Sequence, residues 1–459
     1  MSNQDFDVIV IGAGPAGEVA AGVLAEAGLD VAIVEKGLVG GECAYWACMP
    51  SKALLRPAQA LAETLRVPGA AETVTRELDV QAVLDRRDQV VHDLDDAAQL
   101  PWLEDKGVKL FRGAGVITGK SEVSVGEDVL MAGKAVIVAT GSSATLPPIE
   151  GLAAAKPWTS HEVTVAKEVP RRLAILGGGV VGVEMAQAWT SLGSKVTLLE
   201  PESRILAREE PFASEQVTEA LTDAGAEVRT GVSAERVDRD DKEVTIRLAG
   251  GDTVVADELL VAAGRKPNTV GLGLDQFGFE EGKPLQTDKF LQVKGQDWLY
   301  ALGDMNGRVL LTHMGKHQAR IASDSILGSE TKGLRKIGDG PGSPRVVFTE
   351  PQVAAVGLTK AGAKDAGIKV RIVEAPTSGN AGGSFYGKDA VGTSRLVMDE
   401  ERDVIVGATF TGVDVQDFLH AATIAVVAEV PCSDLHYCIP SFPTRSEVWL
   451  RLLDQMTCH

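Results

Sequence analysis

The sequence predicts an α/β fold, because one pattern of strand, glycine turn, helix and strand occurs twice in a chain of 459 residues. The first copy begins with the apolar strand 7–11, and the second begins with the strand 173–176. Continuous apolar strands of this kind are typical of parallel sheets that helices cover on both faces. A chain of this length is too long for one hydrophobic core, so we expect several domains.

Three glycines, Gly12, Gly14 and Gly17, follow the first strand directly and open a helix. Gly12 allows the tight turn, Gly14 lets a pyrophosphate approach the helix N-terminus, and Gly17 lets helix and strand pack closely. The next strand, 31–34, ends at Glu35, whose carboxylate can accept hydrogen bonds from an adenosine ribose. The complete order predicts a dinucleotide-binding unit, whereas isolated glycines would predict only a structural turn.

The second unit repeats this order with Gly177, Gly179 and Gly182, and its next strand ends at Glu200. A carboxylate at that place can bind two ribose hydroxyls but repels a 2′-phosphate. Glu200 therefore favours NADH over NADPH, while Arg204, close by in sequence, is the argument for NADPH. Two dinucleotide units in one chain indicate either two bound nucleotides or a duplication in which one site is lost.

Two cysteines, Cys43 and Cys48, follow the first unit. In one regular helix their Cα atoms would lie about 7.5 Å apart along the axis, whereas a disulfide needs a Cα separation of about 4.4–6.8 Å. The turn must therefore be bent if they are to bond, and Pro50 gives a cause because it has no N–H and its ring crowds the preceding turn. We expect a redox-active disulfide on the first turn of a helix; the alternative is two buried, unreactive cysteines.

Charge and composition exclude several classes of partner. The chain has 45 basic and 64 acidic residues and a net charge of -19, which repels nucleic acid and anionic membranes. No run of about 18 apolar residues predicts a membrane span. Five cysteines in so long a chain are not a disulfide scaffold. We expect a cytoplasmic protein, in which a close cysteine pair is catalytic rather than structural.

The segment from Gly40 to Lys52 resembles the active-site segment of the FAD-dependent pyridine nucleotide–disulfide oxidoreductases, whose usual form is Gly-Gly-x-Cys-x-x-x-x-Cys-x-Pro-[Ser/Thr]-Lys. The resemblance covers nearly the whole chain. It implies an α/β protein with two Rossmann-like FAD- and NAD(P)-binding domains plus an α+β C-terminal dimerisation domain. It also implies a homodimer, FAD in the first unit and NAD(P)H in the second, with electrons passing from flavin to disulfide and on to an acceptor.

The same resemblance divides the chain into four parts. The FAD-binding domain with the redox disulfide is expected at 1–145, and the NAD(P)-binding domain at 146–268. A central, FAD-binding segment is expected at 269–338, and the dimerisation domain at 339–459.

The family's roles can be carried over to matching positions. Cys48 would lie nearer the flavin, and Cys43 would exchange with the substrate. Lys52 would lie near the flavin N5 and pair with Glu184 of the second nucleotide domain. The other matching positions are assigned to cofactor binding: Gly115 near the adenine, Thr140 where the chain leaves the first domain, Gly264 in the segment returning from the NAD domain, Asp304 beside the ribityl chain, and Thr312 beside the flavin pyrimidine.

The C-terminal segment departs from the family. Phe442 stands where dihydrolipoamide dehydrogenase and glutathione reductase have a histidine that moves protons, although the glutamate that orients this histidine remains as Glu447. Phenylalanine carries no proton, and loss of an acid/base group costs about 10²–10⁴-fold in rate. We therefore expect a disulfide or a related acceptor, and the alternatives are mercuric ion, a quinone or oxygen. A nucleotide-binding protein without turnover is a further alternative.

Other residues are candidates for the missing proton carrier. His436 and Cys438 lie close to Phe442 in sequence, although a lone histidine at such a place is more often structural or exposed than catalytic. Cys458 with the terminal His459 would suit a soft metal ion, or is simply the end of the chain. No residue is assigned as a metal ligand.

Overall fold

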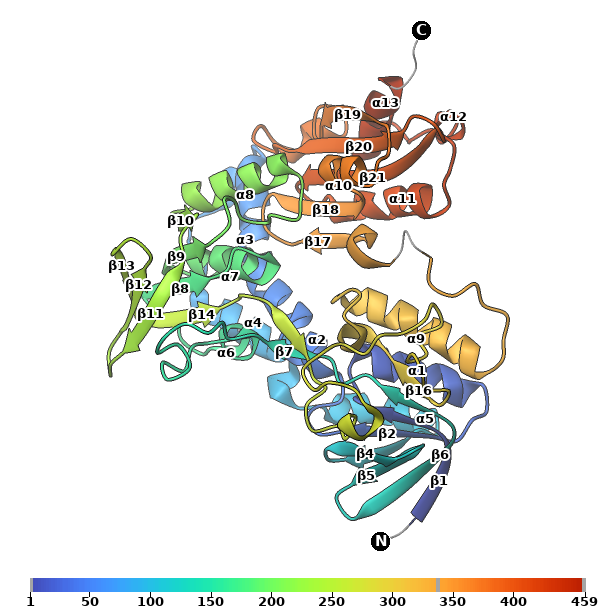
Figure 1. Ribbon diagram of the computed structural model, residues 1–459. Coiled ribbons are helices and arrows are strands. Elements are labelled where there is room, and N and C mark those ends of the chain that lie inside the picture. The colour runs from blue at the N-terminus through green and yellow to red at the C-terminus, as the bar shows by residue number, and fades with distance from the viewer. Residues whose placement is uncertain (1–2, 336–338, 456–459) are drawn as a thin grey trace. The chain divides into compact units, whose positions relative to one another are not determined.

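The computed structural model describes residues 3–335 and 339–455 (Figure 1). The chain forms two compact units, each made of segments that are far apart in sequence. Unit 1 comprises Met1–Pro50, Asp88–Thr145 and Arg265–Gly340. Unit 2 comprises Ser51–Arg87, Leu146–Gly264 and Pro341–His459.

Unit 1 is built on a sheet in the order β3-β2-β1-β6-β5-β4, in which β16 also pairs with β6. Strands β1, β2, β3, β6 and β16 are parallel, whereas β4 and β5 are antiparallel. Val8, Ile9 and Val10 are completely buried, as expected for a central parallel strand. The bounds are β1 (Asn3–Ile11), β2 (Val31–Glu35), β3 (Lys109–Arg112), β4 (Gly115–Gly119), β5 (Glu122–Val125), β6 (Asp128–Val138) and β16 (Leu299–Ala301).

Two helices of unit 1, α1 (Pro15–Glu26) and α9 (Thr312–Ile326), pack side by side (Figure 1). A Cβ atom at Gly315 of α9 would lie only 3.2 Å from the Cβ of Ala16 in α1, so this contact is close. Shorter elements complete the unit: α2 (Gly41–Tyr45), α5 (Leu100–Asp105), β7 (Ser142–Ala144) and β15 (Arg265–Pro267). The division between the units falls inside α3 (Cys48–Arg66), after Pro50.

Unit 2 contains a second parallel sheet, in the order β10-β9-β8-β14. An antiparallel sheet, β11-β12-β13, follows in the chain. The strands are β8 (Arg172–Leu176), β9 (Lys195–Glu200), β10 (Glu227–Thr230), β11 (Ala234–Arg239), β12 (Val244–Leu248), β13 (Thr253–Ala256) and β14 (Glu258–Val261). The helices of this region are α4 (Val80–Val90), α6 (Ser160–Val165), α7 (Val180–Ser191) and α8 (Pro211–Asp223).

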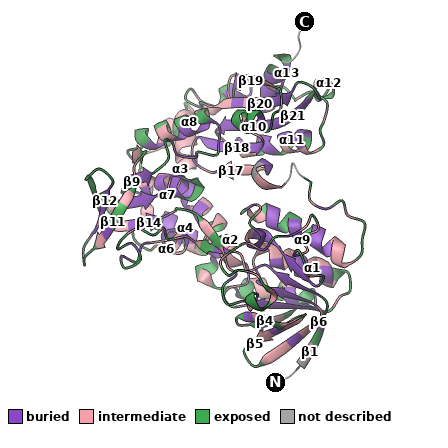
Figure 2. Cartoon of the chain, viewed as in Figure 1, coloured by how far each residue is buried: buried purple, intermediate pink, exposed green. Residues whose placement is uncertain are grey.

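The C-terminal part of unit 2 is an antiparallel sheet in the order β17-β18-β21-β20-β19. Strands β18 and β21 are buried along their whole length (Figure 2). The strands are β17 (Arg345–Val347), β18 (Gln352–Gly357), β19 (Val370–Pro376), β20 (Thr393–Asp399) and β21 (Val404–Gly412). The helices are α10 (Lys360–Asp365), α11 (Gln416–Val427), α12 (Cys432–Leu435) and α13 (Val448–Asp454).

The predicted fold class is confirmed: in each of two sheets made largely of parallel strands, the first strand leads into a Rossmann-like glycine turn, and an antiparallel sheet with helices forms the C-terminal part. The division of the chain at residues 145, 268 and 338 stays a prediction. Within the described residues, no helix combines the length and the apolar character that a membrane crossing requires.

The glycine turn of unit 2 explains why that sequence is so restricted. Gly177 has a φ angle of +109°, which only glycine adopts without strain. A Cβ atom at Gly182 would lie 1.9 Å from the carbonyl oxygen of Gly177, so the helix and strand approach closely only because this side chain is absent. Gly179 differs, since a Cβ atom there meets no heavy atom of the described residues within 4 Å.

Gly182→Ala should therefore destabilise unit 2, because the new methyl group collides with rigid backbone. We expect a cost of about 1–3 kcal/mol, the usual range for overpacking, seen as a lower midpoint of thermal unfolding followed by circular dichroism. Gly179→Ala is the matched control, since its φ angle of -76° suits alanine. Identical midpoints for both variants would contradict this account of the turn.

Candidate active site

The two cysteines lie on two successive helices rather than on one bent turn. Cys43 belongs to α2, Cys48 is the first residue of α3, and Trp46 between them has non-helical angles of φ -134° and ψ 2°. Proline is tolerated in the first turn of a helix, where the N–H has no partner in any case. Pro50 therefore fixes where α3 begins, and the distortion expected within one turn is instead a complete break at Trp46.

Backbone contacts hold the cysteine segment against the first glycine turn, within unit 1. The N–H of Gly40 donates to the carbonyl oxygen of Ala13 at 2.8 Å. A Cβ atom at Gly41 would lie 2.8 Å from the Cα of Gly14, so only glycine permits this approach. The segment that carries Cys43 is thereby fixed at the start of α1.

The two thiols and the start of α9 form one cluster. The Cys48 Sγ lies 3.3 Å from the Thr312 Oγ1, and both cysteines are half-buried thiols that form no disulfide in this structure. A hydrogen bond with Cys48, followed by burial, raises the pKa of Cys43 above that of an ordinary cysteine, while Thr312 and Lys316 act in the opposite direction. The structure thus brings together three predicted residues, Cys43, Cys48 and Thr312.

The first glycine turn has the shape that a dinucleotide requires. Gly12 has a φ angle of +105°, and a Cβ atom at Gly17 would lie 1.9 Å from its carbonyl oxygen. Gly14 faces open space among the described residues, at the N-terminus of α1. The Glu35 carboxylate accepts the N–H of Ala13 at 2.7 Å, so an acid lies beside this free helix end. These residues fit a bound dinucleotide.

The second glycine turn repeats this geometry in unit 2. Its acid, Glu200, accepts the N–H of Gly178 at 2.5 Å and that of Glu202 at 2.8 Å. Gly179 faces open space at the N-terminus of α7. The guanidinium of Arg204 donates to backbone carbonyls of the following loop, including that of Ala207 at 2.6 Å. Unit 2 therefore fits a second dinucleotide.

Asp304 lies in a network whose other members the sequence did not single out. Its carboxylate accepts a short hydrogen bond from the Ser142 hydroxyl, and Arg265 donates to the same hydroxyl at 2.7 Å. Arg265 also donates to Glu42, the neighbour of Cys43, at 3.1 Å. Burial raises the pKa of Asp304, opposed by Ser142 and Arg265. Arg265 follows the glycine of the segment Gly264–Asn268, a position that a search for charged residues near such turns would have found.

Thr140, Gly115 and Gly264, three other predicted cofactor contacts, lie in three different environments. The Thr140 Oγ1 donates to the carbonyl oxygen of Asn268 at 2.9 Å, which ties two segments of unit 1. Gly115 is buried, and a Cβ atom there would lie 3.1 Å from both Ile11 and Val34. Gly264, the last residue of its segment of unit 2, has a φ angle of +117° and free space around it among the described residues.

Lys52 and Glu184, which were predicted to pair, do so within unit 2. The Lys52 Nζ lies 2.7 Å from the Glu184 Oε2, and the Glu184 side chain is almost completely buried. The other carboxylate oxygen accepts the N–H of Phe348 at 2.9 Å. The Lys52 Nζ also lies 4.6 Å from the centre of the Phe348 ring. This charge is therefore held from two sides.

The candidate residues near the C-terminus differ in exposure and in hydrogen bonding. Phe442 is 77% exposed, and Glu447 accepts the N–H of Gly382 at 3.4 Å. His436 is half-buried and Cys438 is exposed. The terminal residues Cys458 and His459 lie outside the described residues. Among the residues that the structure does describe, no group of three His, Cys, Asp or Glu side chains is arranged to hold a metal ion.

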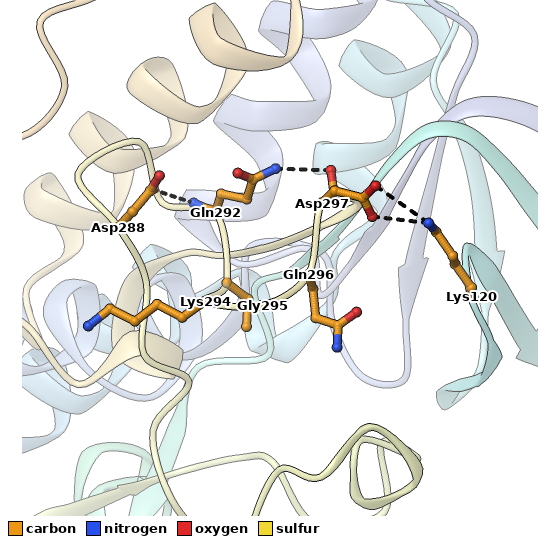
Figure 3. Close-up of a pocket in the computed structure, with 8 residues that line it drawn as sticks. Lys120, Asp288, Gln292, Lys294, Gly295, Gln296 and Asp297 are labelled. Atoms are coloured by element: carbon orange, nitrogen blue, oxygen red, sulfur yellow. Dashed lines mark hydrogen bonds and ion pairs between the residues drawn. The ribbon is translucent and has the colours of Figure 1, made fainter.

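A surface pocket of unit 1 contains none of the predicted site residues (Figure 3). Two of its lining residues, Lys120 and Asp297, form an ion pair at 3.1 Å. The side-chain amide of Gln292 donates a hydrogen bond to the carbonyl oxygen of Asp297 at 2.9 Å. Because its main charges already neutralise each other, we assign no function to this pocket.

Two dinucleotide cradles and a pair of half-buried thiols define a nucleotide-dependent redox protein. Residues 6–319 match the family described as pyridine nucleotide-disulphide oxidoreductase, and residues 343–452 match the dimerisation domain of that family. The chain belongs to this family of enzymes, whose members bind FAD and NAD(P). The pair Cys43–Cys48 corresponds to the family's redox disulfide.

Relatives with different acceptors are similarly close. A mercuric reductase from Lysinibacillus sphaericus is 31% identical over 453 residues, covering 97% of this chain and 82% of that protein. A dihydrolipoyl dehydrogenase from Chlorobaculum tepidum is 34% identical over 458 residues, covering 96% and 95%. The solved structure of a Cu(II) complex of the HOCl-induced flavoprotein disulfide reductase RclA from Escherichia coli has a TM-score of 0.87 and 26% identity, covering 99% of this chain and 100% of that one. Similarity alone therefore leaves the substrate open.

In the reduced protein, alkylation of Cys43 by iodoacetamide should be slow until the pH exceeds the usual range of a cysteine, because the thiolate is the nucleophile and the pKa of Cys43 is raised. Cys48→Ala removes the largest cause, so the rate profile of Cys43 should move to lower pH. Mass spectrometry of the labelled peptides separates Cys43 from the exposed Cys438, which serves as the internal reference. If the Cys43 profile is the same in the wild type and in Cys48→Ala, Cys48 does not raise the pKa of Cys43.

Proposed function

We propose that this enzyme uses NADH to reduce a disulfide or a related acceptor through FAD and the Cys43–Cys48 pair. The observation that carries the proposal is the position of this pair in unit 1. The segment with Cys43 rests on the first glycine turn, and Cys48 contacts Thr312 at the start of α9. FAD, when bound, supplies the two-electron step between nicotinamide and disulfide.

The residues of unit 1 divide the work of holding that cofactor. The free N–H groups at Gly14 would bind the pyrophosphate, and Glu35 would accept from a ribose. Asp304 would face the ribityl chain, with its carboxylate oriented by Ser142 and Arg265. Gly115 and Thr140 are further proposed cofactor contacts in unit 1, and Gly177 and Gly264 are proposed contacts of the second nucleotide.

The side chains near the reacting groups have separate tasks. Cys48 is the thiol on the flavin side, and Cys43 exchanges with the acceptor. Lys52 would supply a positive charge near the flavin N5, as the family resemblance implies, and Glu184 holds that charge in position. Glu447 would keep only its structural bond with Gly382, since Phe442 gives it no imidazole to orient.

Two contacts favour NADH. One oxygen of Glu200 accepts from Gly178 of the glycine loop and the other from Glu202 after β9, which holds a carboxylate where it accepts from ribose hydroxyls but repels a 2′-phosphate. Arg204, the residue that would attract that phosphate, donates to the carbonyls of Leu206, Ala207 and Glu209 instead. The guanidinium is thus engaged by its own loop.

Glu200→Gln should lower kcat/KM for NADH by about tenfold or more, since a hydrogen bond to a charged group contributes about 1.5–3 kcal/mol. The ratio of NADPH to NADH activity should rise, because the repulsion is removed. Glu202→Gln, on an exposed side chain, is the control and should keep the NADH rate. A wild-type enzyme that prefers NADPH would refute this assignment.

Anaerobic titration tests the electron path itself. The wild-type enzyme should take up two electrons for the flavin and two more for the disulfide, and should expose two new thiols per chain. Cys48→Ser should take up only the electrons of the flavin. Both quantities can be read from the flavin absorbance and a thiol assay after denaturation. A wild-type uptake that stops at the flavin, with no new thiols, would rule out the proposed path.

We also propose that the enzyme is a homodimer. The segment before the active-site Phe442 exposes large apolar side chains, with Tyr437 84% and Ile439 79% exposed. Exposed groups of this size are typical of an interface. Sedimentation that gives the mass of a single chain, 48.2 kDa, would contradict a dimer.

Direct transfer from the flavin to mercuric ion, a quinone or oxygen is the second candidate. It is favoured by Phe442, because such acceptors need no proton carrier at the disulfide. Cys43→Ser separates the two candidates in a screen of lipoamide, small disulfides, mercuric ion and quinones: unchanged quinone turnover indicates direct transfer, and loss of disulfide turnover supports the first proposal. The cytoplasmic location stays a prediction from cysteine usage.

A further inference from the structure

The loop of residues 201–210, which follows β9, lies directly on the second glycine turn. The N–H of Leu206 donates to the carbonyl oxygen of Gly178 at 2.9 Å, while the N–H of Gly178 donates to the Glu200 carboxylate at 2.5 Å. A Cβ atom at Gly178 would lie 2.7 Å from the Cγ2 of Ile205 in this loop. Because these contacts are so close, a shift of the loop would displace the glycine turn and Glu200 relative to each other.

The end of this loop carries a buried carboxylate that belongs to a second part of unit 2. Both oxygens of Glu209 bind the guanidinium of Arg345 in β17, at 2.6 Å from Nε and 2.9 Å from Nη2. A bidentate pair of this kind fixes orientation as well as distance. Arg345 lies in the region that matches the family's dimerisation domain. The loop beside the nucleotide cradle is therefore joined to the C-terminal sheet.

The next residue, Glu210, makes a second connection to the same sheet. It is buried, and it precedes the first turn of α8. One carboxylate oxygen accepts the N–H of Lys360, the first residue of α10, at 2.7 Å. The other oxygen binds the guanidinium of Arg395 in β20 at 2.5 Å. Two successive carboxylates thus join the loop to three elements of the C-terminal part.

Hydrogen bonds within the loop connect this end to the glycine turn. The N–H of Glu209 donates to the carbonyl oxygen of Leu206 at 2.9 Å. The Arg204 guanidinium donates to the carbonyl oxygens of Ala207 and Glu209, at 2.6 and 3.0 Å. Leu206 in turn bonds to Gly178. A continuous series of contacts therefore runs from Arg345 through Glu209 and Leu206 to the cradle.

We propose that Arg345 and Glu209 are positioning residues for the adenosine half of the nicotinamide nucleotide, so that the C-terminal sheet sets the affinity of the second cradle. Arg345 holds Glu209, Glu209 holds the loop, and the loop holds Glu200 where a ribose binds. A buried ion pair contributes little net stability, since desolvation opposes its attraction, so the fixed geometry of this pair is its contribution. The inference rests on the proposed function, because it needs a nucleotide at Glu200.

Binding of ADP-ribose to the oxidised holoenzyme, measured by isothermal titration calorimetry, tests the proposal without turnover. ADP-ribose contains the adenosine and both phosphates but no nicotinamide ring. Arg345→Gln should raise its Kd about tenfold, the effect of one lost hydrogen bond to a charged group. Arg239→Gln is the matched control, because Arg239 binds Glu258 through two nitrogens in a half-buried pair that joins β11 to β14. This control should keep the wild-type Kd.

Steady-state kinetics separate positioning from general damage to the fold. In NADH-driven turnover, Arg345→Gln should raise KM about tenfold and leave kcat near the wild-type value, because the lost contact acts in binding. With reduced nicotinamide mononucleotide, which lacks the adenosine half, the variant and the wild type should have equal kcat/KM. The double variant Glu200→Gln/Arg345→Gln should bind ADP-ribose about as weakly as Glu200→Gln alone, since both changes remove the same contact.

Arg345→Lys decides the proposal if Arg345→Gln does not fold. Lysine keeps a positive charge beside the buried Glu209, but an ammonium group cannot hold both carboxylate oxygens in the planar geometry of a guanidinium. We expect a Kd for ADP-ribose above that of the wild type and, where both variants fold, below that of Arg345→Gln. A Kd equal to that of the wild type would refute the proposal.

The outcomes distinguish this inference from the proposed function. If Arg345→Gln binds ADP-ribose as tightly as Arg239→Gln, or loses turnover with NADH and with reduced nicotinamide mononucleotide alike, the positioning role is refuted and the electron path stands. If the double variant loses affinity about a hundredfold, Arg345 acts independently of Glu200 and the inference falls. If the wild type binds no ADP-ribose or prefers NADPH, the proposed use of NADH fails and this inference fails with it.

Discussion

The absence of a side chain at Gly41 is the constraint on which the site depends. A methyl group there would collide with Gly14, so the cysteine segment can approach the start of α1 only when position 41 is glycine. The hydrogen bond from Gly40 to Ala13 fixes this approach in register. The same few residues then open the end of α1 toward a pyrophosphate and place Cys43 beside it. Cofactor binding and redox chemistry thus share one backbone contact in unit 1.

Each nucleotide cradle also uses its acid twice. Glu35 accepts the N–H of Ala13 inside the glycine turn and that of Gly37 after its own strand, at 2.7 and 2.6 Å. Glu200 does the same in unit 2 with Gly178 and Glu202. A carboxylate oriented in this way needs no rearrangement when a ribose arrives. The repeat in sequence is therefore a repeat of hydrogen bonds as well as of glycines.

Local pattern was sufficient to predict much of the fold. Gly17 and Gly182 are dictated by clashes within a single strand–turn–helix unit, and Gly12 and Gly177 by the positive φ angles of their turns, so this spacing is readable from sequence. Pro50 likewise set the start of α3, but the break at Trp46 depends on how the segment lies on α1 and was not readable. The pairing of Lys52 with Glu184 came from the family resemblance, since nothing local links residues so far apart.

The remaining parts of the site arise from contacts between distant segments. Arg265 meets Ser142 and Glu42 only because the chain folds back, and no periodicity encodes that meeting. The roles of these residues follow from the environment that the fold creates and not from their type.

The loop after β9 has a consequence for attempts to redesign the enzyme. Arg204 is a structural clamp: its guanidinium joins the carbonyls of Leu206, Ala207 and Glu209, and Leu206 adopts a positive φ angle of +48° under that clamp. Recruiting this arginine to a phosphate would leave those carbonyls without their donor and loosen the turn. Cofactor exchange in this scaffold therefore calls for a rebuilt loop with a new cation, rather than for a single change of charge.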